Sequence, residues 1–209
     1  MGNKKNCNRD GTMLPLVEEF FTIQGEGYHA GEAAWFIRLG GCDVGCNWCD
    51  SRFSWDPEMH PLVETDKIIE NALHSGTKSV VVTGGEPLIW DLDYLCAGLK
   101  DNKICTFIET SGAYPLSGQW DWICLSPKRN MPPVGNICLM ADELKVIIET
   151  RVDFGWAEKH RKMVGTRCQL FLQPEWSRSD AIIPEIVEYV KGNPQWKISL
   201  QIHKYMHIP

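Results

Sequence analysis

The stretch LGGCDVGCNWCDS, residues 39–51, carries three cysteines, Cys42, Cys46 and Cys49, in a C-x3-C-x2-C spacing. A structural zinc ion takes four ligands and a disulfide takes two thiols, so three thiols on one short loop leave a coordination position to be filled from elsewhere. The spacing alone leaves two explanations open. A distant Cys or His could complete a zinc site, or the thiolates could bind three irons of a [4Fe–4S] cluster and leave its fourth iron open to another ligand.

This loop lies in a chain whose short apolar runs alternate with longer segments of helical periodicity. Such alternation predicts an α/β fold, in which helices cover a parallel sheet. The first apolar run could also be an edge strand or a lid. The expected strands are Glu18–Ile23, Ala34–Leu39, Ser79–Thr83, Ile104–Glu109, Trp122–Leu125, Glu143–Ile148, Gln169–Leu172 and Lys197–Gln201. The expected helices are Asp66–Ser75, Asp91–Asp101, Arg151–Val164 and Ser179–Gly192.

Short polar and glycine-rich segments follow the apolar runs. After the cysteine loop come TGGEP (83–87), ETSG (109–112), SPK (126–128) and QPEW (173–176), and QIHK (201–204) ends the last run. In parallel α/β folds the loops at the carboxyl ends of the strands converge on one opening, which carries the active site. The sequence therefore predicts a functional site on that rim.

The length of the chain limits the type of barrel. A complete eight-stranded α/β barrel needs roughly 250 residues, and this chain has 209. A truncated, open (β/α)6-type barrel of about six parallel strands is expected instead. Residues 1–13, which include Cys7, are expected to form a flexible tail. Residues 14–209 are expected to form a single domain without internal repeats.

Net charge, apolar run length and cysteine content limit the classes of protein that fit this chain. The formal net charge of -6 gives no support to a surface for nucleic acid or anionic lipid. The sequence has no apolar run long enough to span a membrane and no signal peptide, so a cytoplasmic protein is expected. In that compartment nine cysteines indicate metal binding and buried thiols. The scattered thiols, expected to be small core residues, are Cys96, Cys105, Cys124, Cys138 and Cys168.

With the aromatic Trp48 before its third cysteine, the loop resembles the radical S-adenosylmethionine (SAM) superfamily. The resemblance extends to GGEP, residues 84–87, which follows the apolar run SVVVT. It implies a [4Fe–4S] cluster on the three cysteines, with SAM chelating the open iron through its amino and carboxylate groups. It also implies a deoxyadenosyl radical that takes hydrogen from a substrate. The residues implied to contact SAM are Trp48, Cys49, Asp50, Gly85, Glu86, Ser126, Pro127, Lys128, Gln173, Pro174, Glu175 and Trp176.

Further sequence segments indicate which family within this superfamily the chain resembles. The segments EEFFTIQGEG (18–27), ELKVII (143–148) and QIHKYMHIP (201–209) are similar to the 7-carboxy-7-deazaguanine synthase family, over nearly the whole chain. That family implies ring contraction of 6-carboxy-5,6,7,8-tetrahydropterin with loss of ammonia, in the biosynthesis of queuosine and other deazapurines. It also implies Mg²⁺, a homodimer, and an electron donor such as flavodoxin or ferredoxin.

The family pattern also implies which residues contact the pterin. They are Ile23, Gln24, Gly25, Arg38, Thr83, Glu109, His203 and Pro209. A guanidinium suits the pterin carboxylate, although Arg38 could also be a surface charge. Glu109 ends a buried strand, where an unpaired carboxylate is costly, so a polar ligand contact is favoured over a structural role. His203 could equally be a structural histidine.

Two positions depart from the family pattern. Ser51 stands where the family's magnesium ligand is often Thr, and a serine hydroxyl can still bind a hard cation. Ser111 in ETSG replaces an Asn that is common in relatives, so a specific amide contact is not expected there.

Two other functions fit part of the sequence. A glycyl-radical-enzyme activase would share the cluster and SAM but would act on a protein backbone. A zinc-dependent interaction module would explain the cysteines and leave GGEP and Arg38 without a role. The basic segment KHRKMVGTR, residues 159–167, is either a solvated helix face or a docking surface for an acidic electron donor.

Overall fold

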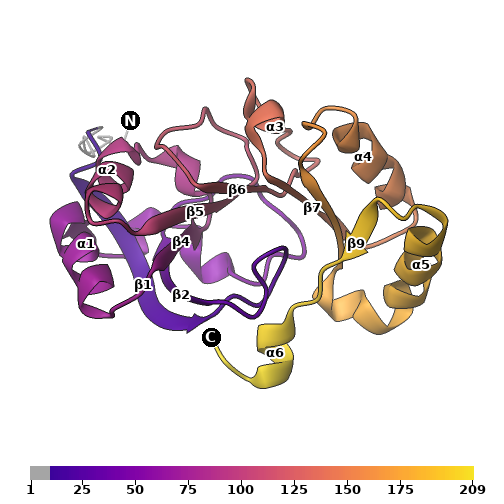
Figure 1. Ribbon diagram of the computed structural model, residues 1–209, viewed down its shortest axis with the longest axis horizontal. Helices are drawn as coiled ribbons and strands as arrows, with labels where there is room; N and C mark the ends of the chain where they lie inside the picture. Colours follow the sequence, from indigo (N-terminus) through magenta and orange to yellow (C-terminus); the bar gives the residue numbers. More distant parts are fainter. Residues whose placement is uncertain (1–9) are drawn as a thin grey trace.

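The computed structural model describes residues 10–209, so residues 1–9, including Cys7, lie outside the described part of the chain. A nine-stranded sheet in the order β3-β1-β2-β4-β5-β6-β7-β8-β9 forms its centre (Figure 1). The strands are β1 (Met13–Ile23), β2 (Ala33–Leu39), β3 (Leu62–Glu64), β4 (Ser79–Gly84), β5 (Cys105–Thr110), β6 (Trp122–Leu125), β7 (Glu143–Ile148), β8 (Gln169–Pro174) and β9 (Trp196–Ile198).

The expected open barrel is confirmed, with one more parallel strand than anticipated. From β2 to β9 each neighbouring pair in the sheet is parallel. β1 and β3 are antiparallel, so the first apolar run is a strand of the sheet rather than a lid. The sheet ends at β3 on one side and at the three-residue strand β9 on the other, so it does not close.

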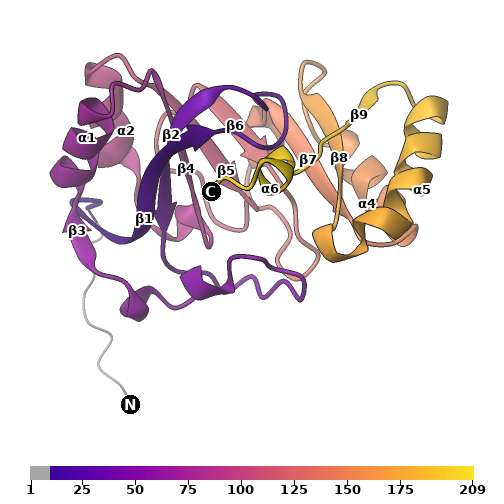
Figure 2. The same cartoon turned by 90° about the horizontal axis from the view of Figure 1, so that it is seen from below.

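Helices cover the convex face of the sheet, as the alternation predicts. α1 and α2 lie at one end of the sheet and α4 and α5 at the other, while the carboxyl-terminal segment lies in the gap between the two ends (Figures 1 and 2). The helices are α1 (Thr65–His74), α2 (Asp93–Asp101), α3 (Ile137–Met140), α4 (Val152–Arg161), α5 (Ser179–Gly192) and α6 (Ile202–Met206). None of the described helices is long and apolar enough to cross a membrane.

The main apolar core lies between the sheet and these helices. β7 shows why. Leu144, Val146 and Ile148 alternate along this strand, and all three are fully buried in the core. Because successive side chains of a strand point to opposite faces, Glu143 and Lys145 must face the concave side instead. The concave side of the sheet is therefore partly polar and ionised.

The amino-terminal tail is shorter than expected. The side chain of Thr65 donates a hydrogen bond to the Gly11 carbonyl at 2.6 Å, and the Thr65 backbone N–H donates to the Thr12 carbonyl at 2.9 Å. β1 then begins at Met13, so residues 10–13 belong to the folded domain. The prediction of a tail up to residue 13 was wrong because the contacts that anchor this segment are distant in sequence.

The expected last strand, Lys197–Gln201, was also wrong at its end. β9 pairs with β8 only as far as Ile198, and the chain then leaves the sheet. The Ile202 N–H donates to the Gly25 carbonyl at 2.9 Å, and residues 202–206 form α6 instead of a strand. The short elements β3 and α3 were not expected from the sequence.

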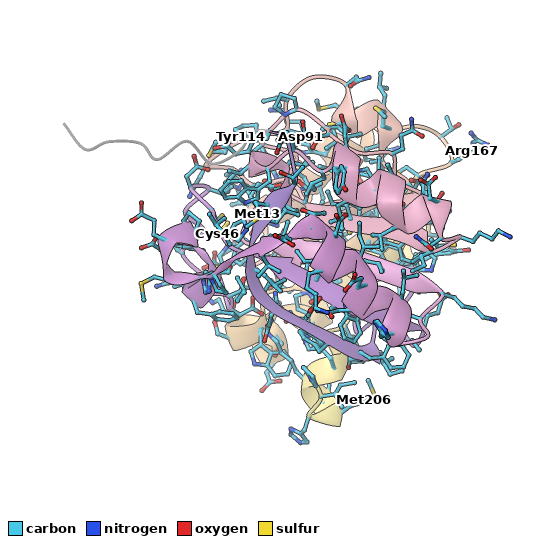
Figure 3. The ribbon with its side chains drawn as sticks, turned by 90° about the vertical axis from the view of Figure 1, so that its left-hand side faces the viewer. Met13, Cys46, Asp91, Tyr114, Arg167 and Met206 are labelled. Atoms are coloured by element: carbon cyan, nitrogen blue, oxygen red, sulfur yellow. The ribbon has the colours of Figure 1, made fainter. Side chains whose placement is uncertain are left out.

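The basic segment 159–167 lies far from the cysteine loop. It runs from the last turn of α4 to the start of β8, and so to the amino-terminal edge of the parallel strands, whereas the cysteine loop follows the carboxyl end of β2. Figure 3 shows Cys46 and Arg167 on opposite sides of the molecule. His160 is buried, and Arg161 is paired with Glu158 at 2.6 Å. This placement gives no support to the hypothesis that the segment guides a donor to the cysteines.

Candidate active site

A cavity of about 730 Å³ opens at the carboxyl ends of the strands. It is lined by every residue that the sequence resemblance implied, except Pro127. The Pro127 carbonyl instead accepts a hydrogen bond from the Trp156 indole at 3.2 Å. The structure thus brings residues from the two ends of the chain, Ile23 and Pro209, to the same opening as the cysteines.

The cysteine loop is fixed by the short 3-10 helix that follows it, η1 (Arg52–Ser54). The Gly41 N–H donates to the Ser54 carbonyl at 2.7 Å, and the Cys42 N–H donates to the Trp55 carbonyl at 3.0 Å. The Trp55 indole N–H also reaches the Cys49 sulfur at 3.3 Å. The loop therefore folds back on itself with its three thiols on the cavity wall.

The three thiols fit an iron–sulfur cluster chemically. Cys42, Cys46 and Cys49 all line the cavity and are free thiols, half-buried rather than enclosed in the core. Burial raises the pKa of Cys42 and of Cys46, and the Lys128 ammonium partly offsets this for Cys46. Metal binding removes such protons, because the thiolate is the ligand. Three free thiols at a partly enclosed cavity thus match a cluster with one open iron.

The GGEP segment is pressed against the cysteine loop. The Gly85 N–H donates to the Leu39 carbonyl at 3.0 Å, and the Glu86 N–H donates to the Gly41 carbonyl at 2.8 Å. A Cβ atom at Gly85 would lie 2.3 Å from the Gly41 carbonyl oxygen and 2.7 Å from the Cys42 Cβ. Only glycine permits this approach. The backbone of GGEP is thereby held beside the cysteines at the cavity wall.

The Glu86 carboxylate links the ends of two neighbouring strands. It is 1% exposed. One oxygen accepts from the Leu88 N–H at 3.1 Å and the Thr110 hydroxyl at 2.5 Å, and the other accepts from both the N–H and the hydroxyl of Ser111. A carboxylate offers about four acceptor positions, so protein donors fill this one. These bonds give the carboxylate a structural role, and its direct contact with SAM stays a prediction. Ser111 takes part through its hydroxyl, a role that the sequence had left open.

We expect Glu86→Gln to lower the free energy of unfolding by about 2 kcal/mol, because hydrogen bonds to a buried charge are worth about 1.5–3 kcal/mol. An amide would also turn one N–H₂ group toward donors. Urea denaturation of the apoprotein measures this loss. The matched control is Glu64→Gln, since Glu64 is exposed and makes no side-chain cap bond with α1. Equal unfolding midpoints for the two variants would contradict the structural role.

A second wall of the cavity carries a half-buried lysine. Lys128 donates to the Ser126 hydroxyl at 2.5 Å, and its ammonium lies 5.2 Å from the centre of the Trp48 ring. Burial lowers the pKa of Lys128. On the opposite wall, the Glu175 carboxylate accepts from the Ser177 N–H at 3.0 Å and so caps the 3-10 helix that begins at Trp176. These groups give the cysteine end of the cavity a mixed polar and aromatic surface.

Further residues that line the cavity carry charged and amide groups. Arg38 donates through Nε to Glu18 at 2.8 Å and contacts the Phe53 ring face, so one edge of its guanidinium is already paired. The Gln24 amide donates to Glu109 at 2.9 Å. Thr83 lines the cavity on the strand that pairs with Arg38. These groups suit a small ligand that carries both a carboxylate and N–H donors.

The carboxyl terminus crosses the mouth of the cavity. The Lys204 ammonium is bonded to the Asp50 carboxylate at 2.7 Å and lies 4.8 Å from the centre of the Trp176 ring. The Thr22 hydroxyl donates to the Pro209 carbonyl at 3.4 Å. Burial lowers the pKa of His203, which also lines the cavity. The terminal segment therefore joins the cysteine loop to the end of β1.

Comparison with known proteins agrees with this geometry. Residues 36–125 match the Radical SAM superfamily. A 7-carboxy-7-deazaguanine synthase from Flavobacterium psychrophilum is 56% identical over 95% of this chain and 94% of that protein. One from Synechocystis sp. is 45% identical over 93% of each chain. The crystal structure of QueE from Escherichia coli superposes with a TM-score of 0.80 at 28% identity, covering 92% of this chain and 95% of that chain.

The chain belongs to the 7-carboxy-7-deazaguanine synthase family of radical SAM enzymes. Membership of this family implies a [4Fe–4S] cluster and SAM, and the three free thiols fit that implication. A zinc interaction module and a glycyl-radical activase are not favoured by these relatives.

Several cavity residues in this family member were not named from its sequence. Glu26, Lys145 and Gln201 lie among the expected pterin residues, and Lys204 closes the mouth. All four lie in the segments EEFFTIQGEG, ELKVII and QIHKYMHIP. The available signal was in ELKVII, where Glu143 and Lys145 occupy alternate positions of an otherwise apolar strand and must share a face.

Proposed function

We propose that this chain converts 6-carboxy-5,6,7,8-tetrahydropterin to 7-carboxy-7-deazaguanine with loss of ammonia, in queuosine or other deazapurine biosynthesis. The observation that carries the proposal is the composition of one cavity. Three free thiols and the GGEP backbone line it together with Arg38, Gln24 and Glu109. The relatives named as 7-carboxy-7-deazaguanine synthases support this choice of substrate.

The cysteine end of the cavity would hold the cofactors. Cys42, Cys46 and Cys49 would ligate the cluster, and the backbone of Gly85 would bind SAM. When bound, the two groups supply a carbon radical that takes hydrogen from the substrate. The remaining cavity residues proposed for SAM, Trp48, Asp50, Glu86, Ser126, Lys128, Gln173, Pro174, Glu175 and Trp176, would position it. Cys49 would contact SAM as well as iron.

The opposite end of the cavity would orient the pterin. The free edge of the Arg38 guanidinium would bind the pterin carboxylate, because a guanidinium matches that group. Ile23, Gln24, Gly25, Thr83 and Glu109 would surround the ring, with His203 and Pro209 above it. The Pro209 carboxylate would accept from N–H groups on the pterin edge. The chain's contribution is then to hold the reacting carbon beside SAM and to exclude water.

Mg²⁺ is part of the proposal through Ser51. The Ser51 hydroxyl lines the cavity and lies 3.5 Å from the Cys49 sulfur. No three His, Cys, Asp or Glu side chains in residues 10–209 converge on a single ion. Mg²⁺ normally keeps several waters and takes few ligands from the protein, so the Ser51 hydroxyl would complete a shell supplied largely by water and bound ligands. A homodimer and a cytoplasmic location are proposed on the family resemblance alone.

The electron donor, proposed to be a flavodoxin or ferredoxin, would approach beside the cysteine loop. We expect the charge reversals Lys162→Glu and Arg167→Glu to leave donor-supported turnover unchanged, because both residues lie on the opposite edge of the sheet. Reversal of Arg52, which is exposed directly after the cysteine loop, is the matched comparison and should slow donor-supported turnover while dithionite-supported turnover stays normal. Slowing by the Lys162 and Arg167 changes with the protein donor alone would contradict this approach.

The proposed substrate is tested by anaerobic incubation of reconstituted protein with SAM, reductant and either the carboxy-tetrahydropterin or a glycyl-radical protein. Formation of 7-carboxy-7-deazaguanine from the pterin, with no protein radical detectable by electron paramagnetic resonance, is the expected result. A glycyl radical on the protein substrate, without pterin turnover, would overturn the proposal.

A further inference from the structure

A buried ammonium lies at the floor of the cavity, on the concave face of β7. The Lys145 side chain is 5% exposed. Its ammonium pairs with the Glu26 carboxylate and lies 3.6 Å from the Glu109 carboxylate. The neighbouring carboxylate of Glu143 faces the same side of the strand. Buried charges are stable only when they are paired, so this lysine and the acids around it form one unit.

The unit holds the loop between β1 and β2 against the concave face of β7. The Tyr28 N–H donates to Glu143 at 3.0 Å, and the Gln201 amide donates to Glu26 at 2.7 Å. Gly27 has a φ of +68°, and a Cβ there would lie 2.0 Å from a Glu143 oxygen. The segments QGEG (24–27) and ELKVII (143–148) thus contact each other across the open barrel.

The charge state of the unit follows from its surroundings. Burial alone would lower the pKa of Lys145, but Cys124, Glu109, Glu26 and Glu143 raise it well above its ordinary value. Burial opposes ionisation of Glu26, yet the Lys145 charge holds the pKa of Glu26 below its ordinary value. Lys145 and Glu26 are therefore both ionised, and they neutralise each other.

Glu109 is the member of this unit that reaches the ligand space. One of its oxygens accepts from Gln24, and the other faces Lys145 at 3.6 Å, a distance too long for a hydrogen bond. Its side chain is 25% exposed, against 13% for Glu26. The single ammonium is matched by Glu26, so the Glu109 carboxylate is left with acceptor capacity at the cavity surface.

We propose that Lys145 is a positioning residue for the substrate: it fixes Glu26 and Glu109 as one layer, so that the Glu109 carboxylate faces the cavity as the acceptor for a ligand edge rich in N–H donors. The inference rests on the proposed function, because the pterin supplies such an edge. Lys145 acts through Glu109 and takes no part in the chemical step. Lys145 holds the Glu109 carboxylate in one orientation, which a flexible side chain at the open edge of the barrel would otherwise lack.

A double-mutant cycle tests whether Lys145 acts through Glu109. In the reconstituted holoenzyme, Lys145→Met and Glu109→Gln are each expected to raise KM for the carboxy-tetrahydropterin by about tenfold, the effect of about 1.4 kcal/mol, while the Kd for SAM is unchanged. The double variant should have a KM close to that of Glu109→Gln alone, because the two residues share one contact. Multiplied effects in the double variant, or an unchanged KM in Lys145→Met, would overturn the proposal.

A second variant separates positioning from folding. Lys145→Met alone leaves Glu26 without its cation, whereas Lys145→Met with Glu26→Gln removes both charges and should regain most of the lost Tm. Its pterin KM should stay raised, and a wild-type KM would overturn the proposal. Lys100→Met, which breaks an ion pair with Asp121 outside the cavity, is the matched control and should leave KM unchanged. Wild-type turnover of the pterin is measured in the same assay, so failure of the proposed function is seen separately, as an absence of turnover in every variant.

Discussion

Replacement of Cys42, Cys46 or Cys49 by Ala is expected to abolish incorporation of the iron–sulfur cluster. Each thiol lies on the cavity wall, and each would supply one of only three protein ligands, so loss of any one leaves two irons without protein thiolate. Iron and sulfide content after anaerobic reconstitution, together with the visible absorption of the cluster, measures the result. We expect the apoprotein to remain folded, because none of the three side chains is in the core.

The other described cysteines provide the control. Cys96, Cys124 and Cys138 are buried, and Cys105 is exposed on β5. Burial raises the pKa of Cys96 to about 12 and that of Cys168 to about 12, which keeps these two as neutral thiols. Single replacement of these five by Ser should leave iron content unchanged. If one of them were required for the cluster, an open coordination position for SAM would be ruled out.

Removal of residues 205–209 is expected to lower pterin turnover by about 10- to 100-fold, the equivalent of one lost charge-assisted contact of about 1.5–3 kcal/mol. The truncated chain keeps His203 and the Lys204–Asp50 ion pair, but it loses the proline that lines the cavity and is held by Thr22. Cluster content and SAM binding should be retained, since their proposed ligands lie on other segments. Steady-state kinetics and iron analysis of one preparation measure both.

A tag at either end of the chain gives a matched comparison. A carboxyl-terminal tag converts the Pro209 carboxylate into a neutral amide and should reduce turnover like the truncation, whereas the same tag at the amino terminus should not. Full turnover with the carboxyl-terminal tag in place would remove the terminal carboxylate from the site.

Local sequence was sufficient to predict the parallel strands and the functional loops at their carboxyl ends. Each parallel strand is a short apolar run followed by glycine or a polar residue, and both features act within a few residues. The convergence of these loops follows from the parallel arrangement alone, so the cavity could be predicted without contacts. The resemblance then assigned its residues, and all but Pro127 line that cavity.

Contacts between distant segments could not be predicted in this way. Lys145 and Glu26 are 119 positions apart, and Lys204 and Asp50 are 154 apart. Nothing in the local pattern of Lys145 indicates which acid it meets. The same holds for the amino-terminal anchor on Thr65 and for the turn into α6, where the Gly25 carbonyl rather than local propensity takes the chain out of the sheet.

The central claim is that one cavity holds SAM and the pterin together, so that the hydrogen at C6 of the pterin passes to the cofactor. The most direct measurement uses carboxy-tetrahydropterin deuterated at C6, with reconstituted enzyme, SAM and dithionite under anaerobic conditions, followed by mass spectrometry. We predict that 7-carboxy-7-deazaguanine forms and that deuterium appears in the recovered SAM. Product without deuterium in SAM, or cleavage of SAM without product, would contradict the account.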